Sequence, residues 1–411
     1  MSDRVVISGM GVVCPIGVGV KEFTDALFAG KNGVGRITHF DPSAYRSQMA
    51  GEVKDFDPLR YLSSKEAKRM DPFTQFGMVA AEEAIQQAGL ETEKEDPTRI
   101  GVLIGSGVGG LLTIEREKEV LIEKGPQRVS PFLVPMLITD IVSAYVAIKY
   151  GFSGPNLSIS TACATGNHAI GEAFKIIQRA DAEVMIAGGA EAAITPLGLA
   201  GFCSMRALST RNQEPTKASR PFDRERDGFV IGEGAGVVVL EELDRARKRG
   251  AHILAEIIGF GMSGDAYHIT QPIQDGSGIR KAMANAMADA KIPPEEVDYI
   301  NAHGTSTPFN DRIETLAIKA LFDSHAHKIP ISSTKSMTGH LLGATGGVEI
   351  VACVVSLRQG AVPPTINYEV PDPDCDLDYV PNQTRETEIQ VALSDSMGFG
   401  GHNSVLIVKK F

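Results

Sequence analysis

Short apolar runs rich in β-branched residues alternate along the chain with stretches in which apolar residues recur at every third or fourth position. The apolar runs predict buried strands that end in glycine-rich turns at 4–11, 99–107, 183–191, 297–304 and 404–410. The stretches of helical period predict helices at 76–89, 166–180, 278–290 and 346–360. This alternation is typical of an α/β fold with a mainly parallel sheet.

Features of the first half of the chain recur in the second half in the same order. The paired features are Gly9 and Gly11 with Gly259 and Gly261, 106–110 with 303–307, 161–166 with 334–339, and the hairpin-like 228–242 with 398–410. We therefore interpret the chain as two related α/β halves, 1–250 and 251–411, and we expect a site at their interface. The stretches 110–150 and 200–227 have no partner in the second half, so they are interpreted as insertions that shape substrate channels or subunit contacts.

The composition of the 411 residues narrows the range of functions. A formal net charge of -11 disfavours nucleic acid and anionic membranes as partners, and no apolar run reaches the roughly 18 residues of a membrane span. The first residues predict a strand instead of a signal peptide, and the five cysteines show no CxxC pair or metal-ligand spacing. Scattered cysteines of this kind are typical of reduced thiols in a cytoplasmic protein.

Cys163 lies in LSISTACATGNHAIGEAF, where an apolar run meets a predicted helix. Unpaired N–H groups and the positive end of the dipole at a helix N-terminus favour a thiolate and lower its pKa. The same N–H groups are suited to stabilise the oxyanion that forms when a thioester carbonyl is attacked. A buried structural cysteine is the alternative for this residue taken alone.

Two histidines of the second half occupy positions that the repeat relates to the Cys163 region. His303 lies in NAHGTST and His340 in TKSMTGHLLGATGG, each at the border of a loop. Two neutral imidazoles beside a thiol are suited to polarise a carbonyl or to transfer a proton. Lys335 is either a solvated loop charge or a buried cation, and a buried cation needs a carboxylate partner such as Glu349.

Four motifs in this order and spacing resemble the elongating β-ketoacyl-acyl-carrier-protein synthases, and within them the synthase II group. The motifs are STACATG, NAHGTSTPFNDRIE, KSMTGHLLGATGG and SMGFGGHN. The resemblance spans essentially the whole chain. It implies a thiolase fold with two βαβαβαββ halves in a five-layered αβαβα arrangement, a homodimer, and substrates carried on the phosphopantetheine of acyl carrier protein, with no other cofactor required.

The resemblance also implies a role for individual residues. Cys163 is acylated, and His303 and His340 promote decarboxylation of malonyl-carrier protein and stabilise the enolate, which attacks the acyl group and lengthens it by two carbons. Lys335 and Glu349 support the histidines. The remaining implied roles are Phe399 as a gate that forms an oxyanion hole with the N–H of Cys163, Thr305 and Thr307 as pantetheine ligands, and Val108 as the end of the acyl pocket.

Two further sets of residues follow from the resemblance. Some relatives hold a structural monovalent cation, Na⁺ or K⁺, at the positions of Asn301, Glu349, Ser394 and Asp395, although Asp395 stands where asparagine is expected. An acidic carrier protein needs a basic surface on a chain of net charge -11. The candidates for carrier docking are Lys65, Lys68, Arg69 and Arg206, with a solvated helix face as the alternative.

Other readings of the motifs differ in one or two residues. Thiolase needs a second cysteine in a late C-x-G motif, but the last cysteine is Cys375. Initiating synthases and plant-type polyketide synthases carry asparagine at the position of His340. A non-catalytic chain-length factor lacks the nucleophile, which is present here as Cys163. The catalytic ketosynthase subunit of a polyketide synthase shares all of these residues, so it remains open, as does the preferred chain length.

Overall fold

A computed structural model describes residues 4–411, and these residues build one large mixed β-sheet. The first half of the chain supplies β1 (Val5–Cys14), β5 (Ile100–Gly105), β6 (Asn156–Leu157), β7 (Val184–Glu191) and β8 (Gly234–Glu242). The second half supplies β9 (Ala255–Gly264), β10 (Tyr299–Asn301), β11 (Ile331–Ser332), β14 (Val391–Gly398) and β15 (His402–Lys409). The five predicted strands correspond to β1, β5, β7, β10 and β15.

The strand order is symmetric about the centre of the sheet. It runs β11-β10-β14-β15-β9-β1-β8-β7-β5-β6, so each strand of the first half has a counterpart at the mirrored position. This order supports, as a proposal, the division into halves at 250/251. The prediction of a mainly parallel sheet is wrong. β5 pairs in parallel with β6 and β7, and β10 with β11 and β14, but β8 lies antiparallel between β7 and β1, and β15 lies antiparallel between β14 and β9.

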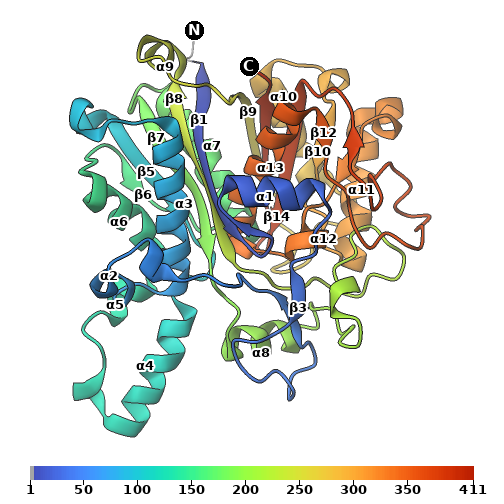
Figure 1. Ribbon diagram of the computed structural model, residues 1–411. Helices are drawn as coiled ribbons and strands as arrows, with labels where there is room; N and C mark the ends of the chain where they lie inside the picture. The colour runs from blue at the N-terminus through green and yellow to red at the C-terminus, as the bar shows by residue number, and fades with distance from the viewer. Residues whose placement is uncertain (1–3) are drawn as a thin grey trace.

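Helices lie on both outer sides of the sheet halves and between them (Figure 1). One outer layer holds α3 (Pro72–Ala88) and α6 (Ile141–Tyr150), and the other holds α10 (Ser277–Ala290) and α11 (Pro308–Phe322). The middle layer holds α7 (Thr165–Gln178) and α13 (Thr345–Gln359), which contact each other and both halves. Residues 345–357 of α13 are all buried, as expected of a helix covered on every side. The order is the five-layered αβαβα arrangement.

The Gly-x-Gly pairs lie inside strands β1 and β9 and not in turns after them, which corrects the sequence prediction. A Cβ atom at Gly11 would lie 1.9 Å from the carbonyl oxygen of Ala80 on α3, and one at Gly261 would lie 2.1 Å from that of Ala282 on α10. The glycines therefore let each outer helix pack directly on the strand backbone. The Gly-x-Gly pair therefore recurs in both halves because each half packs an outer helix closely on its strand, and not because it forms a turn.

The counterpart of the segment 161–166 is 341–346, and not 334–339 as predicted. Each segment forms a short 3-10 turn that begins with a residue of positive φ, Ala162 (51°) or Leu342 (49°). Each then starts a middle-layer helix with a threonine of φ -51° and ψ -54°, Thr165 or Thr345. The shared letters Ala-Thr-Gly at 164–166 and 344–346 follow this geometry.

The two predicted insertions carry elements that project from the layers or border the site. They include α4 (Leu111–Lys124), α5 (Leu133–Leu137) and α8 (Pro196–Ser204). However, α6 lies between β5 and β6 in the chain as α11 lies between β10 and β11, so the insertion is shorter than 110–150. The chain also forms the short helices α2 (Ser64–Ala67) and α12 (Lys335–Thr338). Within residues 4–411, no helix has the length and apolar character needed to cross a membrane.

Candidate active site

Cys163 lies in the turn that precedes α7, as the sequence predicts. The turn is held by the hydroxyl of Thr165, which accepts from the backbone N–H of Thr161 (2.9 Å) and donates to the carbonyl of Ala162 (2.7 Å). Ala162 adopts a φ of 51°, a conformation that non-glycine residues keep only when their surroundings enforce it. The strained turn places the thiol, whose residue is only 7% exposed, in the wall of a cavity of about 420 Å³.

The pKa of Cys163 is raised to about 12, which corrects the prediction of a lowered value. Burial is the largest cause, and the charge of Lys335 and the backbone N–H of Phe399 oppose it. The helix N-terminus is present, but in a closed cavity the loss of water around the thiolate outweighs it. Cys163 is therefore a neutral thiol near pH 7.

His303 and His340 lie together beside this cavity. Their ring centroids are 5.3 Å apart and the rings meet edge to face. His303 follows β10, and its Nδ1 has no hydrogen-bond partner within residues 4–411. Burial lowers the pKa of both imidazoles well below the usual value, and the charge of Lys335 lowers it further. Both rings are therefore neutral near pH 7.

The hydrogen bonds of His340 select one tautomer. Its Nδ1 accepts from the backbone N–H of Leu342 (3.3 Å) and lies 3.1 Å from the hydroxyl of Thr345. Because Nδ1 is an acceptor in a neutral ring, the proton resides on Nε2. His340 thus presents an N–H donor, held by the 3-10 turn that corresponds to the turn of Cys163.

Lys335 is buried, which agrees with the second of the two alternatives from the sequence, a buried cation instead of a solvated loop charge. Its Nζ donates to Oε1 of Glu349 at 2.5 Å, and both side chains are 1% exposed. Burial raises the pKa of Glu349 to about 7 even though Lys335 opposes the shift. The charge of Lys335 lowers the pKa of His303, of His340 and of the Cys163 thiol.

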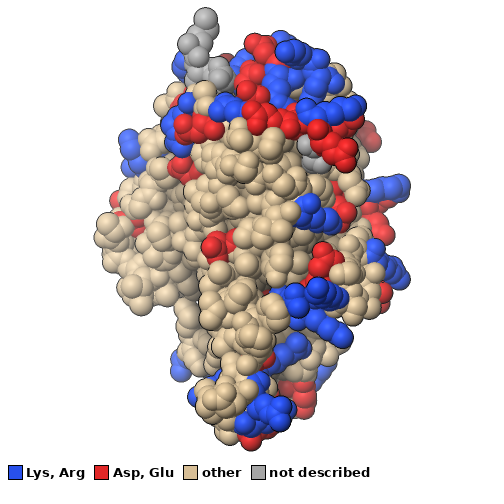
Figure 2. Space-filling view, turned by 90° about the vertical axis from the view of Figure 1, so that its left-hand side faces the viewer, with Lys and Arg blue, Asp and Glu red and all other residues tan. Residues whose placement is uncertain are grey.

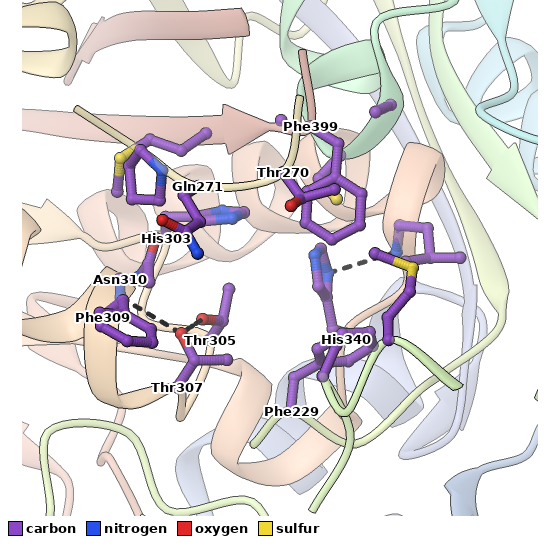
Figure 3. Close-up of a pocket in the computed structure, with 18 of the residues that line it drawn as sticks. Phe229, Thr270, Gln271, His303, Thr305, Thr307, Phe309, Asn310, His340 and Phe399 are labelled. Atoms are coloured by element: carbon purple, nitrogen blue, oxygen red, sulfur yellow. Dashed lines mark hydrogen bonds between the residues drawn. The ribbon is translucent and has the colours of Figure 1, made fainter. Parts of the chain in front are cut away.

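The cavity has a volume of about 420 Å³, which suits an extended organic ligand. Figure 3 shows Thr305 and Thr307 on one side, His340 and Phe229 on the other, and Phe399 near the top of the view. The hydroxyls of Thr305 and Thr307 are 3.0 Å apart, and Thr307 also accepts from the N–H of Asn310 at the start of α11. The structure thus brings the predicted Cys, His, Thr and Phe residues to one cavity.

Phe399 lies in the turn between β14 and β15 and follows Gly398, which approaches the backbone around Cys163 closely. A Cβ at Gly398 would lie 2.5 Å from the carbonyl oxygen of Thr161 and 3.3 Å from the N–H nitrogen of Cys163. Only glycine lets the backbone of this turn come so near. The backbone N–H of Phe399 lowers the pKa of Cys163, so the two residues are near each other in this cavity wall, and the oxyanion hole stays a prediction.

Glu191 is a residue of the site that the sequence analysis missed. Its buried carboxylate accepts from the hydroxyl of Ser106 (2.7 Å) and from the N–H groups of Gly107 (2.9 Å), Val108 (3.1 Å) and Gly343 (3.0 Å). It therefore ties the loop of Val108, which lines the cavity, to the turn after His340. The one available signal was a carboxylate ending an otherwise apolar strand.

The residues of the predicted cation site come together from β10, β14 and α13. Asn301 and Ser394 are paired neighbours in β10 and β14, and both are fully buried. The amide N–H of Asn301 donates to the hydroxyl of Tyr299, and the amide oxygen of Asn301 has no hydrogen-bond partner in the described residues. The Ser394 hydroxyl, one Glu349 oxygen and both Asp395 oxygens likewise have none. Unpartnered oxygens of this kind fit Na⁺ or K⁺. Within residues 4–411 no group of three His, Cys, Asp or Glu side chains suits a metal ion.

The four docking candidates come from two different elements, Lys65, Lys68 and Arg69 from α2 and the residues after it and Arg206 from the segment after α8. Arg206 is exposed and lines the cavity, whereas Lys65, Lys68 and Arg69, at α2, are not among its lining residues. The guanidinium of Arg69 lies 4.4 Å from the ring centroid of Phe132. Figure 2 shows Lys and Arg side chains gathered in the lower half of the face turned to the viewer, below a broad surface with few charges.

Comparison with known families identifies the architecture around this site. Residues 2–246 match the family described as Beta-ketoacyl synthase, N-terminal domain, and residues 254–369 match the Beta-ketoacyl synthase, C-terminal domain. The chain belongs to the β-ketoacyl synthase family. The predicted family and the acyltransferase class of enzyme are thereby confirmed.

Curated relatives of this β-ketoacyl synthase share its full length. The protein from Synechocystis is 53% identical over 408 residues, which are 99% of this chain and 98% of the relative. The protein from Coxiella burnetii is 54% identical over 407 residues, with the same coverage. Both are named 3-oxoacyl-[acyl-carrier-protein] synthase 2, which confirms the predicted synthase II group.

Solved structures confirm the predicted thiolase fold. A ketosynthase of a type II polyketide synthase, determined with its acyl-carrier protein and a bound hexaketide, has a TM-score of 0.92 and 38% identity. A β-ketoacyl synthase from Burkholderia phymatum has a TM-score of 0.93 and 36% identity. Each comparison covers 100% of both chains.

Proposed function

We propose that the chain is a 3-oxoacyl-[acyl-carrier-protein] synthase of type II, which lengthens an acyl group by decarboxylative condensation with malonyl-carrier protein. One observation carries the proposal: a strained turn at a helix N-terminus presents a thiol to the same cavity as two neutral imidazoles. Relatives of 53 and 54% identity that bear this name support the choice of substrate carrier.

In the first half-reaction the thiol of Cys163 attacks the carbonyl of an acyl thioester. The proton leaves sulfur as the C–S bond forms, and His303, a neutral imidazole that lines the same cavity as Cys163, accepts it. The N–H groups of Cys163 and Phe399 stabilise the oxyanion. The old C–S bond then breaks, and the departing thiolate of the carrier arm takes the proton, so the acyl group ends on Cys163.

In the second half-reaction the malonyl group loses CO₂ and leaves its electron pair as an enolate. The Nε2–H of His340 is held in position to donate to the enolate oxygen, because Leu342 fixes the tautomer. The enolate carbon attacks the acyl carbonyl, the C–S bond to Cys163 breaks, and the departing thiolate takes up a proton from water. Release of CO₂ removes a product and makes the carbon–carbon bond formation irreversible.

Lys335 and the carboxylates behind it set the charge of the site. The ammonium keeps the imidazoles unprotonated and favours the developing enolate, while Glu349 holds the ammonium in place. A Na⁺ or K⁺ at Asn301, Glu349, Ser394 and Asp395 would offset the repulsion between buried carboxyl groups. Burial and Glu314 raise the pKa of Asp395 well above its usual value, so this position is suited to hold a proton.

An assay of half-reactions tests the proposed function. Wild type and Cys163→Ser are supplied with malonyl-carrier protein and saturated acyl-carrier proteins of graded length. We expect condensation and CO₂ release with wild type and no acyl-enzyme with Cys163→Ser. Condensation by Cys163→Ser at the wild-type rate would refute the proposal. The fatty-acid pathway is favoured over the polyketide one because the polyketide ketosynthase above is 38% identical and the synthase 2 relatives 53 and 54%.

We propose that Lys65, Lys68, Arg69 and Arg206 bind the acidic carrier protein. The exposure of Lys65, Lys68 and Arg206 supports this role. Reversing Lys65 and Arg69 to glutamate is expected to weaken carrier-dependent turnover more than hydrolysis of a small thioester. An equal effect on both substrates would contradict the docking role.

We propose that the enzyme is a homodimer joined along the edge of strand β6. This strand ends the sheet, with β5 as its one neighbour, and Leu157 on it is exposed, as are Ile148 and Val134 nearby in the chain. A free strand edge beside exposed apolar side chains is suited to pair with a second copy. Leu157→Asp should lower the mass found by analytical ultracentrifugation, whereas Leu316→Asp on outer helix α11 should not. A wild-type mass for Leu157→Asp would contradict this interface.

A further inference from the structure

A second, smaller cavity adjoins the mouth of the active-site cavity. Its volume is about 200 Å³, and we call it the arginine cavity. Its lining residues are Arg46, Ser47, Cys203, Arg206, Leu208, Thr210 and Asp227. Arg206 and Asp227 line both cavities, so the two cavities adjoin at these residues.

The arginine cavity carries a net positive charge. The guanidinium groups of Arg46 and Arg206 form no ion pair within 4.0 Å and no side-chain hydrogen bond with any residue in 4–411. Asp227 is the one acidic residue in the lining, and its carboxylate already accepts from the hydroxyl of Ser209 (2.6 Å) and the N–H of Thr210 (2.9 Å). The lining therefore holds two guanidinium groups without an ion pair and one carboxylate, which already accepts hydrogen bonds from Ser209 and Thr210.

Ser47 adds an unused polar group to the lining. It is 1% exposed, and its hydroxyl oxygen has no hydrogen-bond partner in the part of the chain that the structure describes. A buried hydroxyl without a partner costs free energy and is uncommon in folded proteins unless a ligand or water completes it. A hydroxyl next to two guanidinium groups offers a donor to an anion.

Arg206 follows the end of α8 and lies at the boundary of the two cavities. Its φ of 55° is in the left-handed region, as are those of Ala180 after α7 and Lys291 after α10.

We propose that the arginine cavity binds the phosphate group of the substrate's pantetheine arm, held between Arg46 and Arg206 with Ser47 as a third donor. Guanidinium groups bind phosphate through paired, charge-assisted hydrogen bonds. The volume of about 200 Å³ is below that of cavities for whole organic ligands, roughly 300–1,000 Å³, so it suits one such group. The inference rests on the proposed function, since it concerns the far end of the same substrate.

The test compares acylation of Cys163 by hexanoyl-pantetheine and hexanoyl-phosphopantetheine, which differ only in the phosphate. Wild type should react at least about tenfold faster, in kcat/KM, with the phosphorylated thioester. Arg46→Ala should remove most of this ratio. Arg179→Ala is the matched control, because it deletes an exposed arginine at the other end of α7, about 20 Å from Cys163. It should leave the ratio unchanged.

Ser47→Ala separates a ligand role from a structural one. Removing a hydroxyl that has no partner should leave the protein at least as stable to urea as wild type, and it should still lower the phosphate ratio. Added phosphopantetheine should raise the melting temperature of wild type more than that of Ser47→Ala. A loss of stability together with an unchanged ratio would overturn the role of Ser47 as a phosphate donor.

Two further substrates, hexanoyl-carrier protein and hexanoyl-CoA, show which phosphate the arginine cavity binds. The same measurements separate a failure of the phosphate proposal from a failure of the proposed function. If Arg46→Ala slows acylation by hexanoyl-carrier protein and by hexanoyl-CoA alike, the phosphate they share is the ligand. If it slows only hexanoyl-CoA, the cavity binds the nucleotide diphosphate and the proposal is wrong. A wild-type ratio of one also overturns it, while the proposed function stands. Failure of every thioester to acylate Cys163 would instead overturn the proposed function.

Discussion

The hydroxyl of Thr165 holds the turn around Cys163, so Thr165→Val tests whether that turn is needed for catalysis. Valine keeps the shape of the side chain but removes two hydrogen bonds, of 2.9 Å to the N–H of Thr161 and 2.7 Å to the carbonyl of Ala162. Thr165 is fully buried. The carbonyl of Ala162 keeps its hydrogen bond from the N–H of Thr165, so the main loss is the partner of the partly buried N–H of Thr161, which costs roughly 1–3 kcal/mol. The free energy of unfolding should therefore fall by about 1–2 kcal/mol.

The same change should slow acylation more than decarboxylation. Without the two bonds the strained Ala162 relaxes, and a loss of roughly 1.4 kcal/mol in positioning the sulfur lowers the rate tenfold. The assays are urea denaturation and the rate of acyl-enzyme formation. An unfolding free energy within about 0.5 kcal/mol of wild type, with a wild-type acylation rate, would refute the reasoning.

Thr345→Val is the matched control, because Thr345 occupies the same place at the start of α13. Its hydroxyl contacts Nδ1 of His340, which keeps its bond from the N–H of Leu342. The expected loss of stability is about 1 kcal/mol. Malonyl decarboxylation should slow while acylation stays near the wild-type rate. Equal loss of acylation in both variants would show that the two turns do not act separately.

Three further predictions test the packing and the electrostatics. Gly11→Ala places a Cβ 1.9 Å from a carbonyl oxygen of α3 and should lower the unfolding free energy by about 3 kcal/mol. Gly201→Ala on α8 is the control, because its Cβ would meet nothing within 4 Å, and it should not lower the unfolding free energy. Equal unfolding free energies of the two variants in urea titrations would contradict the packing. Burial lowers the pKa of His168 to about 4 in the folded protein, against 6.5 in the unfolded chain. The free energy of unfolding should therefore fall by up to about 1.4 kcal/mol per pH unit as the pH drops from 6.5 towards 4. His168→Gln should flatten that slope in denaturation measured at several pH values. Lys335→Met removes a charge that lowers the pKa of His303, so the acid limb of the decarboxylation rate should move to higher pH, and an unmoved limb would contradict the electrostatic role.

The sequence predicted local features well because neighbouring residues encode them. Apolar runs and helical periods located the principal strands and helices, and Gly89 and Gly360, with φ of 61° and 65°, end α3 and α13 as predicted. The motifs around Cys163 and His340 placed both residues next to the helix starts where the structure has them. Such positions depend on a few consecutive residues, so a single sequence carries them.

Contacts between distant residues decided the rest. The antiparallel insertion of β8 and β15, the four bonds of Glu191 and the union of Arg46 with Arg206 in one cavity join segments far apart in the chain. The pKa of Cys163 shows the difference most directly. The sequence by itself determined that a thiol precedes a helix, which lowers a pKa. Only the tertiary structure decided that the thiol is buried, and burial raises that pKa because a thiolate in a closed cavity loses its water.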